Sequence, residues 1–292
     1  MEKVIIRVPA STSNLGPGFD CLGVALKIYN ALTVMRGNSK QRRPQIVDEA
    51  ARRFFKRSRV PAFPFSLGLD ENVPRSRGLG GSATVRLGVL HGLNELSGRP
   101  LDRLSIFQLC AELEDHPDNA APASFGGFTV ARGNKVQRFE VSPRLYFVLL
   151  IPNFEVKTSM ARKILPAKIS RLAAVESCGN ACAITAAFAS RNYENMRGAF
   201  ADQLHQPFRQ KLIPILSRVI AAAENAGALG AFLSGSGSTI CALTLQDRHK
   251  VAAAMQRAAS PPIRRTRPMA RSTSLRIVIT TADNHGVKSN GP

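Results

Sequence analysis

Tryptophan is absent from this chain of 292 residues, tyrosine occurs only 3 times, and acidic residues are half as frequent as basic ones. The 20 Asp and Glu against 40 Lys and Arg leave a formal net charge of +20 at pH 7. Such an excess attracts polyanions, but binding to single-stranded nucleic acid also needs aromatic side chains on which bases stack. Because the basic residues are spread along the chain, we interpret the charge as that of solvated faces and keep a basic nucleic-acid-binding protein as an alternative.

The chain also lacks a paired cysteine framework and a long apolar run. Its cysteines, at positions 21, 110, 178, 182 and 241, are odd in number, which suits reduced thiols. Cys178 and Cys182 stand in an alanine-rich stretch with no histidine near them, which favours core packing over a metal site. No run approaches the roughly 18 apolar residues of a membrane span, and the N-terminal residues lack the apolar core of a signal peptide. We therefore expect a cytoplasmic protein without a membrane partner.

A Walker A motif is missing too, because no Gly-Lys pair is followed by Ser or Thr. The chain has instead a glycine-rich stretch at residues 74–83, followed by an apolar pattern typical of a helix. Glycines let the backbone close around a phosphate, and a helix N-terminus offers free N–H groups and the positive end of the helix dipole. The stretch therefore predicts an anion site, with Arg75 and Arg77 raising its positive potential.

Two other interpretations of this loop stay open on its residues alone. In the first, it is a glycine-rich turn and Ser82 caps the helix. In the second, it is a dinucleotide fingerprint, because Gly78, Gly80 and Ala83 fit G-x-G-x-x-A. That fingerprint needs a strand just before the loop. Residues 70–77 are polar and contain Pro74, and a strand is hard to see in residues 61–73, so we discount it.

The loop, Pro-x3-Gly-Leu-Gly-x-Ser-Ala, resembles the phosphate loop of the GHMP kinase superfamily. Residues 8–20 and 230–239 resemble its two other glycine-containing motifs, in the expected order. Three further segments, 112–122, 157–162 and 204–209, are similar to the homoserine kinases within that superfamily. The resemblance extends from residue 4 to residue 288, nearly the whole chain.

The resemblance implies an α+β fold in two domains. Residues 1–152 would form an N-terminal ribosomal-protein-like α/β domain with the phosphate loop, and residues 153–292 a C-terminal ferredoxin-like α+β domain. It implies ATP and Mg²⁺ as cofactors and L-homoserine as the acceptor, phosphorylated on its side-chain hydroxyl in threonine biosynthesis. Another GHMP small-molecule kinase with a different acceptor is the alternative, and a homodimer is left open.

By the same resemblance, the nucleotide phosphates would lie on Pro74, Arg75, Ser76, Arg77, Gly78, Leu79, Gly80, Gly81, Ser82 and Ala83. Ser82 would also ligate Mg²⁺, and Gly81 stands where the family has another serine. The second metal ligand is a glutamate before His116, for which Glu114 fits best and Glu112 is the reserve. The adenine is expected between this loop and residues 36–73.

The resemblance also supplies the acceptor site. Arg162 and Arg209 would hold the substrate carboxylate, for which the planar guanidinium fork is suited. Asp20 would pair with the ammonium, and Asn14 and Asn119 would bind near the hydroxyl. Asn119 cannot accept a proton, so Asn119, Arg162 and Arg209 would act by positioning and electrostatics without a strong general base.

Hydrophobic periodicity predicts the remaining elements. We expect a strand at 4–8 that Pro9 ends, a loop at 10–18, and helices near 46–59, 82–96 and 102–114. A buried strand is expected at 145–151, and helices near 158–165, 173–190, 193–204, 213–225 and 248–259. Residues 260–276 read as a linker, 275–280 as the final strand, and the tail after 288 as disordered.

Overall fold

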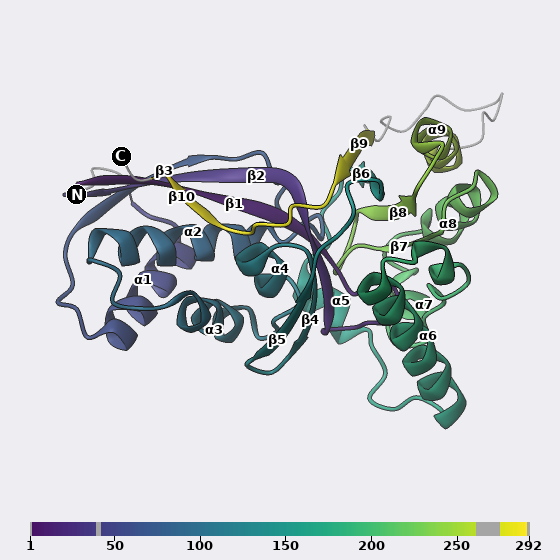
Figure 1. Cartoon of the computed structure of the whole chain (residues 1–292), viewed down its shortest axis with the longest axis horizontal. Helices are drawn as coiled ribbons and strands as arrows, with labels where there is room; N and C mark the ends of the chain where they lie inside the picture. Colours follow the sequence, from purple (N-terminus) through teal and green to yellow (C-terminus); the bar gives the residue numbers. More distant parts are fainter. Residues whose placement is uncertain (1, 39–41, 261–274, 291–292) are drawn as a thin grey trace.

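The computed structural model describes residues 2–38, 42–260 and 275–290, and within them the strands form two sheets (Figure 1). The first sheet contains β1 (Lys3–Ser13), β2 (Leu22–Arg36), β3 (Phe65–Asp70), β4 (Phe128–Arg132), β5 (Lys135–Phe139) and β10 (Lys288–Asn290). The second contains β6 (Tyr146–Pro152), β7 (Gly230–Leu233), β8 (Ile240–Thr244) and β9 (Leu275–Thr281). The mixture of sheets and helices confirms the predicted α+β fold class.

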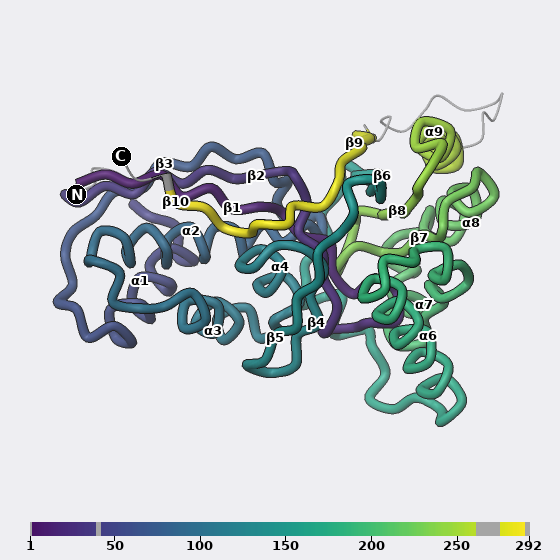
Figure 2. Tube along the Cα trace, in the orientation of Figure 1, coloured from purple at the N-terminus to yellow at the C-terminus, as the bar shows by residue number. Residues whose placement is uncertain are grey.

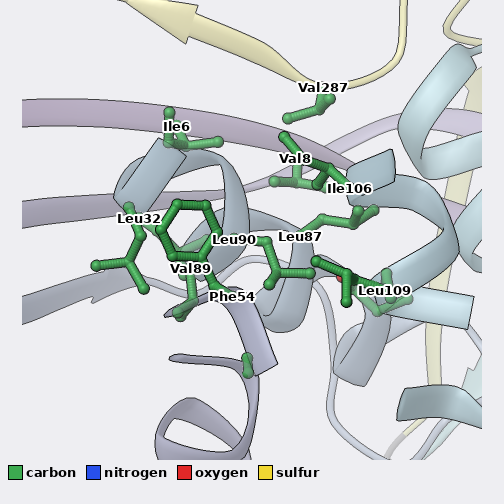
Figure 3. Packing of buried hydrophobic residues seen from close by; sticks show 14 of the residues in the cluster. Ile6, Val8, Leu32, Phe54, Leu87, Val89, Leu90, Ile106, Leu109 and Val287 are labelled. Atoms are coloured by element: carbon green, nitrogen blue, oxygen red, sulfur yellow. The ribbon is translucent and has the colours of Figure 1, made fainter. Parts of the chain in front are cut away.

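One face of the first sheet is covered by helices (Figure 1). These are α1 (Gln45–Ser58), α2 (Gly81–Leu96), α3 (Arg103–Glu114) and α4 (Ala120–Phe125). The strand order is β10-β1-β2-β4-β5, with β3 on β2. Ile6 and Val8 alternate with exposed residues along β1 and pack toward Leu87 and Leu90 of α2 (Figure 3). Each fully buried side chain of this kind stabilises the fold by about 1.5–3 kcal/mol, so this core fixes where α2 begins.

The second sheet has the ferredoxin-like order. Its strands follow the chain as β6, β7, β8 and β9 but lie as β7-β8-β6-β9, all antiparallel. The helices α8 (Leu216–Asn225) and α9 (Arg248–Ala259) pack on it through Val219 and Val251. The other connections are α5 (Thr158–Lys163), α6 (Arg171–Ser190), the 3₁₀ helix η1 (Tyr193–Met196) and α7 (Gln206–Arg209). Phe128 of β4 stacks on Phe188 of α6 with ring centroids 4.1 Å apart, so one core joins the two sheets.

Strand pairing crosses the division expected at residue 152. β6 ends at that residue and pairs with β8 and β9 in the second sheet. β10 lies at the far end of the chain and pairs antiparallel with β1 in the first sheet. The first and last described strands therefore lie side by side at one end of the molecule (Figure 2).

Several predicted elements were wrong in their extent. β1 continues through Pro9 to Ser13, and its pairing with β2 shifts register between Pro9 and Ala10, the kind of irregularity at which a strand tolerates proline. The predicted helix at 193–204 is reduced to η1: Gly198 has φ +78°, and Asp202 accepts the backbone N–H groups of the next turn. β9 is not the final strand, and residues 288–290 are a strand and not a disordered tail.

β3 is the strand that sequence reasoning could not see before the glycine loop. It pairs antiparallel with β2 from Ala31–Asp70 to Arg36–Phe65. Most of the expected linker, residues 261–274, lies outside the described residues. The loop is therefore preceded by a strand, and only Glu71, Asn72 and Val73 separate Asp70 from Pro74, the first residue of the loop.

The surface of α6 corrects two expectations. Cys178 and Cys182 are exposed, so they do not pack in the core. By length and composition alone, the helix is also long and apolar enough to cross a membrane, whereas the sequence was expected to contain no apolar run of that length. Its inner face nevertheless packs Ile184 and Phe188 into the core, as a helix of a globular domain does.

Candidate functional site

The glycine loop is held between the two sheets by backbone bonds. Ser11 N–H of β1 donates to Leu79 O (3.2 Å), and Thr239 N–H donates to Arg77 O (3.1 Å). The Ser234 hydroxyl donates to Gly78 O (2.6 Å). These bonds come from both ends of the chain, so the loop geometry depends on both sheets.

Two glycines of the loop stand where no other residue fits. Gly78 has φ +72°, and a Cβ there would lie 2.0 Å from Ser234 O. Gly80 has φ +68° and is the N-cap residue of α2; a Cβ there would lie 2.2 Å from Ser11 Oγ. No side chain of the described residues caps α2, and Thr84 N–H donates to Gly80 O. The N–H groups at the start of α2 are thus available to an anion, which argues against Ser82 being only a cap.

Ser82 and Glu114 meet beside this helix start. The Ser82 hydroxyl donates to Glu114 Oε2 at 2.7 Å, and both residues line the central cleft. Glu112, two residues earlier on α3, is exposed and does not line it. A hydroxyl and a carboxylate are hard oxygen donors of the kind Mg²⁺ accepts next to phosphates, so Ser82 and Glu114 fit a magnesium ion and Glu112 does not.

Two arginines lie around one aromatic ring across the cleft. Arg162 Nη2 lies 2.6 Å from Asp20 Oδ1, and the guanidinium carbons of Arg162 and Arg209 lie 5.3 and 5.2 Å from the centre of the Phe19 ring. Arg209 is the last residue of α7, whose first turn contains Pro207, so that proline begins a helix where a break was expected. The site thus presents a carboxylate and two guanidinium groups within one cluster.

Arg209 is buried, with 2% of its surface exposed. Its Nε donates to Ala161 O (3.2 Å) and its Nη1 to Gly235 O (3.0 Å). Within the described residues Nη2 donates to no protein acceptor, so it is free for a ligand in the cleft. Burial, together with the charge of Arg162, lowers the pKa of Arg209 to about 10, which leaves it charged at neutral pH.

The two asparagines are fixed by backbone and hydroxyl groups. Asn14 donates to Gly235 O (3.1 Å) and accepts from Asp20 N–H (3.0 Å), so it holds Asp20 in place. Asn119 Oδ1 accepts from the Ser11 hydroxyl (2.8 Å), and Nδ2 donates to Ser13 Oγ (3.0 Å). Ser11 and Ser13 lie at the end of β1 that was expected to be a loop, so their role was missed.

His116 and Asp118 form a buried pair next to Asn119. His116 Nδ1 lies 3.2 Å from Asp118 Oδ1. Burial alone would lower the pKa of His116, but the hydrogen bond and charge of Asp118 raise it. Burial alone would raise the pKa of Asp118, but His116 and Arg162 lower it. Asp118 is therefore an ionised carboxylate whose Oδ1 already accepts a hydrogen bond from His116. With Asp20 these side chains form a cluster of metal-ligating types, but Arg162 already pairs with Asp20 there.

A single cleft of about 570 Å³ brings these groups together. It is lined by the acceptor-side residues Asn14, Asp20, Asn119, Arg162 and Arg209, by the loop residues Arg75, Ser76, Gly78, Gly80, Gly81 and Ser82, and by Glu114. Beyond the loop its wall is apolar, formed by Ile46 and Val47 of α1 and by Leu67 and Leu69 of β3. This is the region between the loop and residues 36–73 where the adenine was expected.

Four residues of the predicted loop do not line the cleft. The side chains of Leu79 and Ala83 are buried in the core, and Pro74 lies outside the lining. Arg77 turns toward the second sheet, where its Nε donates to Pro152 O (3.0 Å) and its Nη1 lies 3.5 Å from Glu155. Sequence reasoning missed Phe19 and His205, which stack at 5.2 Å behind Arg209, although both lie inside the motifs that it singled out.

Comparison with known proteins gives one family. Residues 45–127 match the family model of the GHMP kinases N-terminal domain, and residues 184–260 that of the GHMP kinases C-terminal domain. A homoserine kinase of Moorella thermoacetica is 38% identical over 268 residues, 86% of this chain and 90% of the relative. One of Synechococcus sp. is 37% identical over 266 residues, 84% of this chain and 87% of the relative.

Solved structures agree with the sequence relatives. The crystal structure of homoserine kinase from Cytophaga hutchinsonii matches with a TM-score of 0.87 and 26% identity, covering 99% of this chain and 98% of that one. The mevalonate kinase of Methanococcus jannaschii matches with a TM-score of 0.68 at 15% identity, covering 94% and 97%. The second likeness concerns the fold alone.

Proposed function

The chain belongs to the GHMP kinase family, and from that premise we propose that it transfers the γ-phosphoryl group of ATP to the side-chain hydroxyl of L-homoserine. The observation that carries the proposal is the composition of one cleft. A helix start suited to phosphates forms one end, and the other holds two arginines, one of them paired with the carboxylate of Asp20. An α-amino acid needs that second end, because it carries an ammonium and a carboxylate on one carbon.

The Asp20–Arg162 pair is suited to receive such a zwitterion. The ammonium of the substrate would bind Asp20, and its carboxylate would bind Arg162 and the free Nη2 of Arg209. Each charge then meets an opposite one, with Asn14 fixing Asp20. A sugar has no carboxylate for the two arginines, and neither a sugar nor mevalonate has an ammonium for Asp20, so the site disfavours those acceptors.

Phosphoryl transfer requires positioning and neutralised charge more than covalent chemistry. We propose that Ser82 and Glu114 hold Mg²⁺, which would neutralise the β- and γ-phosphates, while the N–H groups at the start of α2 bind the phosphate oxygens. Asn119 would orient the acceptor hydroxyl. Asp118 is a poor base because its pKa is lowered and His116 already donates a hydrogen bond to it, which supports a reaction without a strong general base.

An assay with purified protein, Mg²⁺ and ATP tests this proposal. ADP release is measured by a coupled assay with L-homoserine, mevalonate and galactose as acceptors. We expect kcat/KM for L-homoserine to exceed the others by orders of magnitude. Turnover of another acceptor without turnover of homoserine would support a different GHMP kinase activity. We also propose that this reaction belongs to threonine biosynthesis and takes place in the cytoplasm.

A further inference from the structure

Arg86 reaches the proposed metal ligand from the helix that carries the phosphate loop. It lies one turn after Ser82 on α2, and its Nη1 forms an ion pair with Glu114 Oε1. Its Nη2 lies 3.9 Å from Glu49 Oε2 on α1. The side chains of Arg86 and Glu114 are 15% and 7% exposed, so this pair is largely removed from water. Among the described residues, Nε of Arg86 is buried without a hydrogen-bond partner.

The two oxygens of Glu114 have different partners. Oε1 faces Arg86, and Oε2 accepts the Ser82 hydroxyl at 2.7 Å. Arg86 therefore orients the carboxylate so that Oε2 is turned to the serine with which it would share the metal. The same arrangement places a positive charge next to the position that a divalent cation would occupy.

That charge affects a free ion and a nucleotide-bound ion in opposite ways. A free Mg²⁺ or Mn²⁺ is repelled by a guanidinium a few ångströms away, and the low dielectric of a partly buried site strengthens the repulsion. A complex of the metal with ATP carries net negative charge and is attracted. An uncharged side chain that tied α1, α2 and α3 together would have no such selective effect.

We propose that Arg86 is a positioning and specificity-determining residue: it orients Glu114 and makes the Ser82–Glu114 site select a metal that arrives with the nucleotide over the free metal. The inference rests on the proposed function, because it assumes that Ser82 and Glu114 hold the metal of the metal–ATP complex.

The test measures Mn²⁺ binding by electron paramagnetic resonance, with and without ATP, in the wild type, Arg86→Met and Arg86→Gln. Arg86→Gln removes the charge but can keep a hydrogen bond to Glu114, so this variant can replace Arg86→Met in the test if the latter does not fold. Without nucleotide, we expect both neutral variants to bind Mn²⁺ about tenfold or more tightly than the wild type, whereas with ATP they should bind it no more tightly. Arg99→Met is the matched control. Arg99 Nε lies 2.8 Å from Glu95 Oε2 at the other end of α2, and the Arg99 side chain is more exposed than that of Arg86.

Unchanged affinity for free Mn²⁺ in both neutral variants would overturn the inference. Glu114→Gln separates this failure from failure of the proposed function. If Glu114→Gln leaves Mn²⁺ binding in the presence of ATP unaltered, the metal site itself is wrong. If Glu114→Gln weakens that binding while the Arg86 variants bind free Mn²⁺ like the wild type, only the role of Arg86 is refuted.

Discussion

Arg209 is held by the unprotonated nitrogen of His205. Nη1 of Arg209 lies 3.2 Å from Nδ1 of His205, and Nε2 of the same ring lies 2.9 Å from Gly16 O. A carbonyl only accepts, so Nε2 carries the proton and Nδ1 accepts from the arginine. Burial, opposed by Asp202 and reinforced by Arg209, lowers the pKa of His205 to about 4, so the ring stays neutral at pH 7.

His205 is therefore predicted to act on the substrate through Arg209. His205→Leu removes the acceptor, and we expect KM for homoserine to rise by about tenfold, since a hydrogen bond to a charged group is worth about 1.5–3 kcal/mol. His205→Asn can accept from Arg209 through its amide oxygen and should recover part of the loss. Steady-state kinetics with each substrate varied in turn will measure this. An equal rise in KM for ATP would point to general loosening of the fold.

Arg209→Lys tests the carboxylate site directly. Lysine keeps the charge but loses the fork that bonds two backbone carbonyls and leaves Nη2 for the ligand. We expect kcat/KM for homoserine to fall by about 10- to 150-fold and KM for ATP to stay within about twofold of the wild-type value. A matching loss for ATP would place Arg209 at the phosphates, and no loss for either substrate would remove it from the site.

Ser82→Ala separates a metal ligand from a structural hydroxyl. Because no side-chain cap is present at α2 among the described residues, the substitution should cost no more than about 1 kcal/mol in the free energy of unfolding. Turnover should fall by at least about tenfold, and the concentration of Mg²⁺ needed for half-maximal rate should rise. Normal turnover in a protein with a clearly lower melting temperature would show that Ser82 serves only the fold.

Two glycines of the loop should respond differently to a side chain. Gly81→Ser places a Cβ at 3.5 Å from Pro74 O, an ordinary contact, so the melting temperature should hardly change. Gly78→Ala combines φ +72° with a Cβ 2.0 Å from Ser234 O. The loop must then shift, and we expect turnover to fall by at least about tenfold together with stability. Equal behaviour of the two variants in thermal unfolding and turnover would contradict this account.

His91 on α2 predicts a loss of stability in acid. Burial, with a smaller effect of Arg103, lowers its pKa from 6.5 to about 3, and Nε2 has no partner among the described residues. As the pH falls, His91 is protonated in the unfolded chain before it is protonated in the folded protein. The contribution of neutral His91 to the free energy of unfolding is therefore fully present above pH 6.5 and is lost as the pH falls toward 3. Between pH 7.5 and pH 5 the free energy of unfolding should fall by on the order of 2 kcal/mol from this group.

His91→Gln isolates that contribution from the other titrating groups. Urea unfolding at both pH values gives the free energy of unfolding of the wild type and of the variant, and so the loss of each between pH 7.5 and pH 5. The wild type should lose more stability than the variant over this interval. Parallel losses would mean that the folded protein accommodates a charged His91.

The sequence predicted best those features that local periodicity determines. The predicted ends of the helix after the glycine loop and of the strand near 145–151 agree with the structure to within one residue, because each element carries one dense apolar pattern. β3 was missed because its partner β2 stabilises it, and its own six residues include Gly68 and Asp70. The strand through Pro9 depended on a register shift that no local pattern encodes.

The site was predictable as a set of residues but not as a geometry. The resemblance named Asp20 and Arg162, yet only the fold shows that they pair with each other. Likewise nothing in the sequence indicates that Arg86 reaches Glu114, because the two residues lie on different helices. Arg77 has the expected charge and the expected place in the loop, but Pro152 and Glu155 draw it out of the cleft.

The pairing of β10 with β1 has a consequence for how the protein is made. Along the chain, β1 precedes and residues 288–290 follow every strand of the second sheet, so β10 is synthesised after all of them. Until then, the outer edge of β1 has open backbone groups that a neighbouring nascent chain can pair with. The first sheet therefore cannot be completed before the strands of the second sheet have been synthesised, and the time that their synthesis takes sets how long that edge is exposed.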